Sequence, residues 1–320
     1  IRNLSGDNRL TGPIVLGGNN SSIRSDAGTL TIASGINRSS GRELILGGAG
    51  NITVEGAIDG DNGFSKDGSG TLTFTAANTF TSSFYISGGT LNVRHAQALG
   101  STSSGTTVAD GATLEMQGGI TVSGEWLSLN ASGLSGNGAL RNVSGDNTWD
   151  GGINFGSDSP NRVQSDSGTL TITRLITSSN HGSLTFGGEG DTTLSGSIAP
   201  QWWRLAVTKE GGGALNLEGA NYFTTLPNAA SKDGSAILTV NAGTVSVQAG
   251  DAVSDAGATA GSGTRVLAVT DSSGLVVGQT AVGSGVAGNS IIAAINGPNQ
   301  VTLSADTTGA VSGVTFGSWS

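Results

Sequence analysis

The sequence predicts an all-β protein: a right-handed parallel β-helix, or solenoid, followed by a small all-β module at the C-terminus. Three observations support this prediction. Glycine provides 55 of the 320 residues, proline only 5, and charged residues only 12%. Short apolar runs alternate with polar residues roughly every 8–12 residues. Long segments of the chain also recur at a large spacing.

The composition excludes two other classes of chain. The glycines follow no G-X-Y period, so the chain is not collagen. Disordered chains usually combine high charge with few β-branched residues, and here the reverse holds. No stretch has a helical pattern. The many glycines also disfavour helices, since each interior glycine would destabilise a helix by about 1 kcal/mol.

The predicted strands are short and separated by corners. They are centred on residues 14–16, 30–32, 44–46, 52–54, 72–74 and 91–93. Wound into coils of roughly 20–30 residues, about 4.8 Å apart, such strands bury one continuous core. Alternation predicts that Leu72 and Phe74 point to one side of their strand and Leu91 and Val93 to one side of theirs, with Thr90 and Asn92 on the other side. We expect Gly and Asn at the corners to supply the positive φ that each turn needs.

An internal repeat divides the chain. Residues 2–8 (RNLSGDN) recur 139 residues later as 141–147 (RNVSGDN), and residues 25–32 recur as 165–172. Lys66 returns as Lys209, and residues 89–93 return as 243–247, so the offset grows to 154 through insertions at corners such as 201–203 and 227–235. The sequence therefore predicts two large solenoid repeats, 1–140 and 141–257, and a separate small all-β module or cap over 258–320.

Residues 66–81, 85–93 and 96–100 carry one further pattern: KDGSGTLTFTAANTFT, YISGGTLNV and AQALG. This stretch resembles the passenger-associated transport repeat of autotransporter proteins, with Phe80 where the family usually has Tyr and Ser82 where it has Gly. The resemblance implies a secreted parallel β-solenoid and no enzymatic chemistry. From Thr264 the tail resembles small all-β modules of bacterial surface and phage fibre proteins.

Charge and composition limit the partners and the compartment. The net charge of −9 and pI near 4.5 disfavour nucleic acid and anionic membranes as partners. No apolar run approaches the roughly 20 residues that span a bilayer, and cysteine is absent. The chain begins at Ile1 without a signal peptide, so we expect a processed product or a fragment of a longer protein. The composition is typical of a secreted, extracellular or cell-surface bacterial protein.

Candidate catalytic and metal-binding residues are few. His95 and His181 stand at non-equivalent positions, so we interpret them as polar turn residues. Residues 59–63, 47–51 and 187–191 only partly match calcium-binding loops, and tight corners explain them better. The loose acidic cluster that a polysaccharide-cleaving solenoid would need consists of Asp158, Asp166, Glu189 and Asp191. We expect no enzyme, no cofactor and no metal.

One inserted corner is a candidate contact surface. Trp202, Trp203 and Arg204 follow Pro200, and adjacent Trp residues on one strand must face opposite sides. An exposed Trp beside Arg is typical of sugar-stacking and subunit interfaces, whereas packing over a gap in the solenoid is the alternative.

These observations predict a non-enzymatic structural protein, namely a rigid stalk, adhesin or fibre component. Unpaired strands at a solenoid end also predict self-association end to end or through the C-terminal module. A host-surface or polysaccharide ligand is a further expected partner. The alternative function is a fibre that binds or depolymerises polysaccharide.

Overall fold

The structure is a computed structural model. It describes residues 1–17, 20–40, 43–155, 160–178, 182–198, 205–219, 238–247, 253–270, 272, 275, 279–288 and 290–317. The chain divides into two compact units. Ile1–Asn216 and Ser231–Val245 belong to the first unit, and Ser246–Ser320 belongs to the second.

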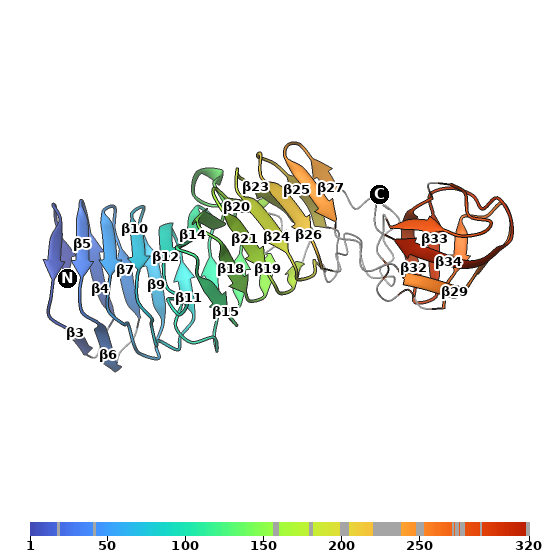
Figure 1. Cartoon of the computed structure of the whole chain (residues 1–320). Coiled ribbons are helices and arrows are strands. Elements are labelled where there is room, and N and C mark those ends of the chain that lie inside the picture. Colours follow the sequence, from blue (N-terminus) through green and yellow to red (C-terminus); the bar gives the residue numbers. More distant parts are fainter. Residues whose placement is uncertain are drawn as a thin grey trace. The chain divides into compact units, whose positions relative to one another are not determined.

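The first unit is a parallel β-solenoid of about nine turns (Figure 1). Sheet 1 contains β1 (Arg2–Asn3), β4 (Ser21–Ser25), β7 (Leu44–Gly47), β9 (Phe64–Asp67), β11 (Phe84–Ile86), β13 (Thr106–Val108), β16 (Leu127–Leu129), β19 (Ile153–Phe155) and β22 (Ile176–Ser178). Sheet 2 contains β2 (Asn8–Leu10), β5 (Thr29–Ile32), β8 (Asn51–Val54), β10 (Thr71–Phe74), β12 (Gly89–Val93), β14 (Ala112–Gln117), β17 (Leu140–Ser144), β20 (Pro160–Ser165), β23 (Gly182–Gly187), β25 (Leu205–Lys209) and β27 (Leu238–Val240).

The third face of the solenoid is less regular. It begins with β3 (Ile14–Gly17) and β6 (Ile36–Ser40), and continues through the bridge between Ile36 and Ile58. Sheet 3 then contains β15 (Thr121–Ser123), β18 (Asn147–Asp150), β21 (Thr169–Ile172), β24 (Asp191–Leu194), β26 (Ala214–Leu217) and β28 (Thr244–Val247). A single 3-10 turn, η1 (Leu134–Gly136), interrupts the strands of the described chain.

Consecutive coils of the described solenoid pair in parallel, with register shifts in β14 next to β17 and in β3 next to β6. Leu30 lies beside Ile52, Ile52 beside Leu72, and Leu72 beside Leu91. The predicted parallel β-solenoid is therefore confirmed, and each predicted strand is present. Side chains of one coil stack on their equivalents in the next, which buries an apolar column along each face.

The core includes a cluster of four phenylalanines inside the passenger-type stretch. The rings of Phe64 and Phe84 stack with centroids 4.4 Å apart, and Phe74 and Phe80 pack around them. All four side chains are at most 2% exposed. Such aromatic pairs are typically worth about 0.5–1.5 kcal/mol beyond their buried area, so this cluster anchors the middle of the first unit.

The outer face of sheet 2 carries polar side chains that bind one another. Thr90 and Asn92 alternate with the core residues of β12, and both are buried, at 8% and 3% exposure. The Asn92 amide donates to Glu115 Oε2 at 2.9 Å, and its oxygen accepts from Arg94 Nε at 2.8 Å. Asn92 is therefore bound both by Glu115 of the next coil and by Arg94 of its own coil.

Glycine and asparagine have different roles at the corners of the solenoid. Among the described residues, positive φ occurs at glycines and at one other residue, Ser135. The expectation that asparagine also supplies positive φ is therefore wrong. Corner asparagines instead satisfy backbone carbonyls: Asn3 Nδ2 donates to Gly6 O, Ser25 Oγ and Ala27 O at 3.0–3.1 Å.

The internal repeat does not correspond to a whole number of coils. The first copy of the RNxSGDN motif starts in β1 of sheet 1, whereas the second lies in β17 of sheet 2. Likewise β5 of sheet 2 corresponds to β21 of sheet 3, and β9 of sheet 1, with Lys66, corresponds to β25 of sheet 2, with Lys209. Each motif of the second copy therefore occupies the next face around the solenoid.

The second unit contains the small C-terminal antiparallel sheet that the sequence predicts. Its strands run in the order β31 (Thr280–Val282), β34 (Val311–Gly317), β29 (Val253–Ala260), β30 (Val266–Ala268), β33 (Gln300–Leu303) and β32 (Ile292–Gly297). Ile292 N donates to Gln279 O and Ala281 N donates to Ser290 O, both at 2.8 Å. These bonds join the two outer strands, so the sheet closes into a barrel around Leu267, Val301 and Phe316.

Candidate functional site

The predicted contact corner cannot be located. Trp202, Trp203 and Arg204 lie outside the described residues, and so do His181 and Asp158. The proposal that this corner contacts a partner therefore stays a prediction from the sequence.

Two of the remaining acids of the predicted cluster, Asp191 and Glu189, bind backbone amides. Asp191 Oδ1 accepts from Ala214 N at 2.7 Å, and Glu189 Oε1 accepts from Gly212 N at 3.3 Å, both in the next coil. Asp146 accepts from Thr169 N in the same way. Each of these three carboxylates accepts a hydrogen bond from a backbone amide of the next coil.

His95 and the first calcium-like loop also have structural partners. His95 Nδ1 accepts from Gln97 N at 3.1 Å within its own turn. Asp59 accepts from Arg38 N at 2.6 Å and from Asn37 Nδ2 at 2.9 Å. The described residues include no cluster of three or more histidine or acidic side chains that would suit a metal ion.

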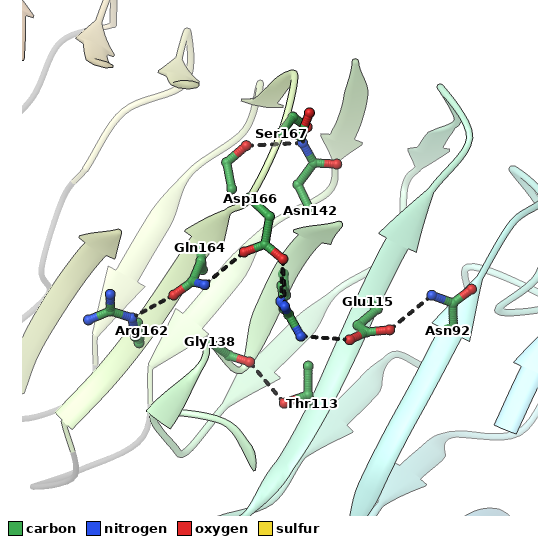
Figure 2. Close-up of polar contacts among 11 residues, drawn as sticks. Asn92, Thr113, Glu115, Gly138, Asn142, Arg162, Gln164, Asp166 and Ser167 are labelled. Carbon is green, nitrogen blue, oxygen red and sulfur yellow. Dashed lines mark hydrogen bonds and ion pairs between the residues drawn. The ribbon is translucent and has the colours of Figure 1, made fainter. Parts of the chain in front are cut away.

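A chain of polar side chains crosses the outer face of sheet 2 (Figure 2). Arg141 is its centre: NH1 donates to Glu115 Oε1 at 3.1 Å, and Nε donates to Asp166 Oδ2 at 2.8 Å. Asp166 also accepts from Gln164 Nε2 at 2.7 Å, and Gln164 accepts from Arg162 Nε at 3.0 Å. Both acids of this polar row, Glu115 and Asp166, are paired with a cation or an amide. The row is therefore a half-buried set of contacts that holds neighbouring coils together.

Two lysines are almost completely buried at corners. Lys66 is 1% exposed, and its Nζ donates to the carbonyls of Asp67, Gly68 and Gly88 at 2.9–3.2 Å. Burial lowers the pKa of Lys66 to about 8, against the opposing charge of Asp67. Lys209 holds the equivalent corner one face further on, donating to the carbonyls of Glu210 and Gly211, and burial lowers its pKa too.

One buried carboxylic acid lies between sheets 3 and 1. Glu125 is 2% exposed, and its Oε1 accepts from Thr106 Oγ1 at 2.7 Å. Within the described chain, Glu125 Oε2 has no hydrogen-bond partner. Burial raises the pKa of Glu125 to about 7, although the Thr106 bond opposes this shift. The group therefore changes charge near neutral pH.

The next residue, Trp126, begins an exposed aromatic surface on sheet 1. Trp126 is 44% exposed and Tyr85, on the outer side of β11, is 47% exposed. Leu175, two coils after Trp126 in the same row, is 41% exposed. Large exposed side chains of this kind are candidates for contact with a ligand or partner.

The sequence analysis did not identify Tyr85, Glu125, Trp126 or the row of polar side chains as parts of a site. The available signals were the alternation of residues 84–86 and the presence of a Trp at position 126. The pairing of Arg141 with Glu115 could not be read from the sequence, since it depends on coil length.

One family model and one curated protein are similar to parts of this chain. Residues 64–93 match the model of the passenger-associated transport repeat, which confirms the resemblance expected from the sequence. The chain is also similar to the adhesin BmaC autotransporter of Brucella suis biovar 1, with 29% identity over 235 residues. That match covers 59% of this chain but only 7% of the much longer relative.

No solved structure matches this chain. No helix in the described part of the chain has the length and apolar character that crossing a lipid bilayer requires. The solenoid, the passenger repeat and the adhesin relative are the findings from which a function can be proposed.

Proposed function

We propose that this chain is a non-enzymatic, adhesive segment of a bacterial surface protein, in which a stiff solenoid carries contact surfaces away from the cell. The observation that carries this proposal is the passenger repeat at residues 64–93, which lies within the parallel solenoid. The similarity to an autotransporter adhesin supports a surface or secreted location. The relative is named an adhesin as a whole protein, and this chain matches 7% of its length. Adhesion by this chain is therefore part of the proposal.

Stiffness follows from how the coils are joined. Backbone hydrogen bonds run between coils on three faces, and ion pairs such as Arg24 with Asp67 at 2.8 Å tie coils that are two apart. Buried corner side chains satisfy carbonyls that would otherwise lose hydrogen bonds. Bending the solenoid would break several of these contacts together.

A non-enzymatic role is supported by the hydrogen-bond partners of the acids in the predicted cluster. Asp166 is held by Arg141 and Gln164, and Asp191 and Glu189 hold backbone amides. A polysaccharide-cleaving site would need two carboxyl groups facing the same bond. Asp166, Asp191 and Glu189 each have such a structural partner.

Adhesion can be tested with the isolated chain. Beads coated with the purified protein should attach to cultured epithelial cells well above beads coated with the same amount of albumin. Attachment equal to that of the albumin beads would contradict the proposal. New reducing ends released from plant or capsular polysaccharide would contradict the non-enzymatic part.

Self-association is a second proposal, in which two copies of this chain meet through the ends of their solenoids or through their C-terminal modules. Strands that are unpaired at the end of a sheet can pair with another copy. Light scattering of the purified chain should then show a mass that increases with concentration, and a constant monomer mass would contradict the proposal.

A further inference from the structure

The side chain of Trp126 is held in a fixed position by a glycine of the next coil. Leu127 pairs with Ile153, so Trp126 stands opposite Gly152. A Cβ placed on Gly152 would lie 2.2 Å from Cζ3 and 2.4 Å from Cε3 of the indole. The six-membered ring therefore rests against the Gly152 backbone, while 44% of the residue stays exposed. Any larger residue at position 152 would push the ring away.

A second aromatic side chain lies on the same face. Tyr85 is in register with Thr107, and Thr107 is in register with Ser128, two residues after Trp126. Two strand spacings across the sheet and two residues along the strand put the Cα atoms of Tyr85 and Trp126 roughly 12 Å apart. The two rings thus mark the ends of a short surface on β11, β13 and β16.

The register row that starts at Tyr85 and passes beside Trp126 is polar. Thr107, Ser128 and Asn154 follow Tyr85 in this row, on β13, β16 and β19, and all three are half-buried. Arg174, which precedes Leu175, is paired with Asp150 at 2.7 Å and so is already neutralised. Hydroxyl and amide groups beside two aromatic rings can donate and accept hydrogen bonds without electrostatic attraction to an ion.

This combination suits a sugar chain better than the other candidate partners. A pyranose ring presents apolar C–H groups on its faces and hydroxyl groups on its rim, which match an aromatic ring and a row of Thr, Ser and Asn. Stable protein–protein contacts usually bury about 800 Å² on each partner around an apolar centre, whereas here the exposed apolar side chains stand apart. Nucleic acids and acidic glycans would face a net charge of −9.

We propose that the outer face of sheet 1 between β11 and β19 binds a neutral oligosaccharide, with Trp126 as the stacking platform and Tyr85 as the second aromatic contact. The inference rests on the proposed adhesive function and names the class of ligand that this function would use. It also gives Gly152 a defined role, since this residue sets the orientation of the platform.

The test is a titration of the full chain, labelled with ¹⁵N in its Trp indoles, against cellohexaose, maltohexaose, mannohexaose and xylohexaose at millimolar concentration. Trp126→Phe assigns the Trp126 indole signal. At least one sugar should shift this signal, and Trp126→Ala should weaken binding about tenfold or more. Gly152→Ala, which keeps the Trp but displaces it, should weaken binding similarly, and Tyr85→Ala should have a smaller effect.

The control is Leu134→Ala, an exposed apolar residue on η1, which should bind as the unmodified chain does. If no sugar shifts the Trp126 signal, or if Trp126→Ala binds normally, the inference is overturned. Bead attachment to cells separates this failure from that of the proposed function. Beads that attach without any sugar response leave the adhesive function standing and remove the ligand class alone.

Discussion

Asn3 and Asn142 make the same three hydrogen bonds at two different corners of the solenoid. Asn3 Nδ2 donates to Gly6 O, Ser25 Oγ and Ala27 O, and Asn142 Nδ2 donates to Gly145 O, Ser165 Oγ and Ser167 O, all at 3.0–3.1 Å. The first corner joins sheet 1 to sheet 2, whereas the second joins sheet 2 to sheet 3. The corner chemistry is therefore independent of the face on which it is used.

The corner network predicts a graded loss of stability. Asn142→Ala should lower the free energy of unfolding by about 3 kcal/mol, because buried carbonyls lose their donor. Asn3→Ala should cost only about 1 kcal/mol, since it lies in the first coil, where terminal structure opens most easily. Urea denaturation followed by Trp fluorescence measures both. Thr171→Ala, on the outer face of sheet 3, serves as the control and should change stability by less than about 0.5 kcal/mol. Equal losses at Asn3 and Asn142 would contradict this account.

Gly70 of the passenger motif should not tolerate a side chain. At Gly70 a Cβ would lie 1.9 Å from the backbone oxygen of Gly50, so Gly70→Ala should cost about 3 kcal/mol or more. Gly12→Ala is the matched control, because no atom lies within 4 Å of its Cβ position. Thermal melts of the two variants give the comparison. A Gly70→Ala protein as stable as Gly12→Ala would show that the coils are not stacked as described.

Glu125 should make the solenoid less stable as the pH rises. Its pKa is raised to about 7 in the folded chain from an ordinary value of 4.5, so between these values the unfolded chain releases a proton that the folded chain keeps. Stability should therefore fall by up to about 3 kcal/mol between pH 4.5 and 7. Glu125→Gln should abolish this loss, and urea midpoints across that range would reveal it. Parallel pH profiles of the two proteins would be the contrary result.

Lys66 has the opposite pH dependence. Its pKa is lowered to about 8 from 10.5, so above pH 8 the folded chain loses a proton that the unfolded chain retains. Stability should rise between pH 8 and 10.5 by up to about 3 kcal/mol. Lys66→Met should remove this rise, leaving the smaller contribution of Lys209, whose pKa is also lowered by burial. Amide exchange or urea midpoints at alkaline pH provide the measurement, and an unchanged rise in Lys66→Met would rule out the buried charge.

Much of the fold was predictable because the strands and corners are specified by short, local sequence patterns. Alternation within runs such as 72–74 indicated the core residues Leu72 and Phe74, and the glycines between the runs indicated the corners. These signals depend only on strand pleating and on glycine conformation. The passenger resemblance at residues 64–93 depends on the same local pattern.

The displacement of the repeat by one face was not predictable. The spacing between paired residues varies from 19, between Leu72 and Leu91, to 31, between Val207 and Leu238. An offset near 140 residues therefore fixes no number of coils. The hydrogen bond between Asn92 and Glu115 was not predictable for the same reason, since it depends on which coils become neighbours. Arg94, in the same coil as Asn92, completes this contact.

The candidate sugar platform shows the limit most clearly. Trp126 is visible in the sequence, but its seat on Gly152 depends on a coil of 26 residues between them. Adjacent residues give no sign of this contact. The sequence could name an exposed Trp as a candidate, and only the register identifies what orients it.

The central claim is that this chain is an adhesive part of a bacterial surface protein. Its most direct measurement is the attachment of intact bacteria that carry the full-length protein to cultured cells, with and without Fab fragments raised against this chain. We predict that the Fab fragments label unpermeabilised bacteria and reduce attachment. Labelling only after permeabilisation, or attachment unchanged by saturating Fab fragments, would contradict the account.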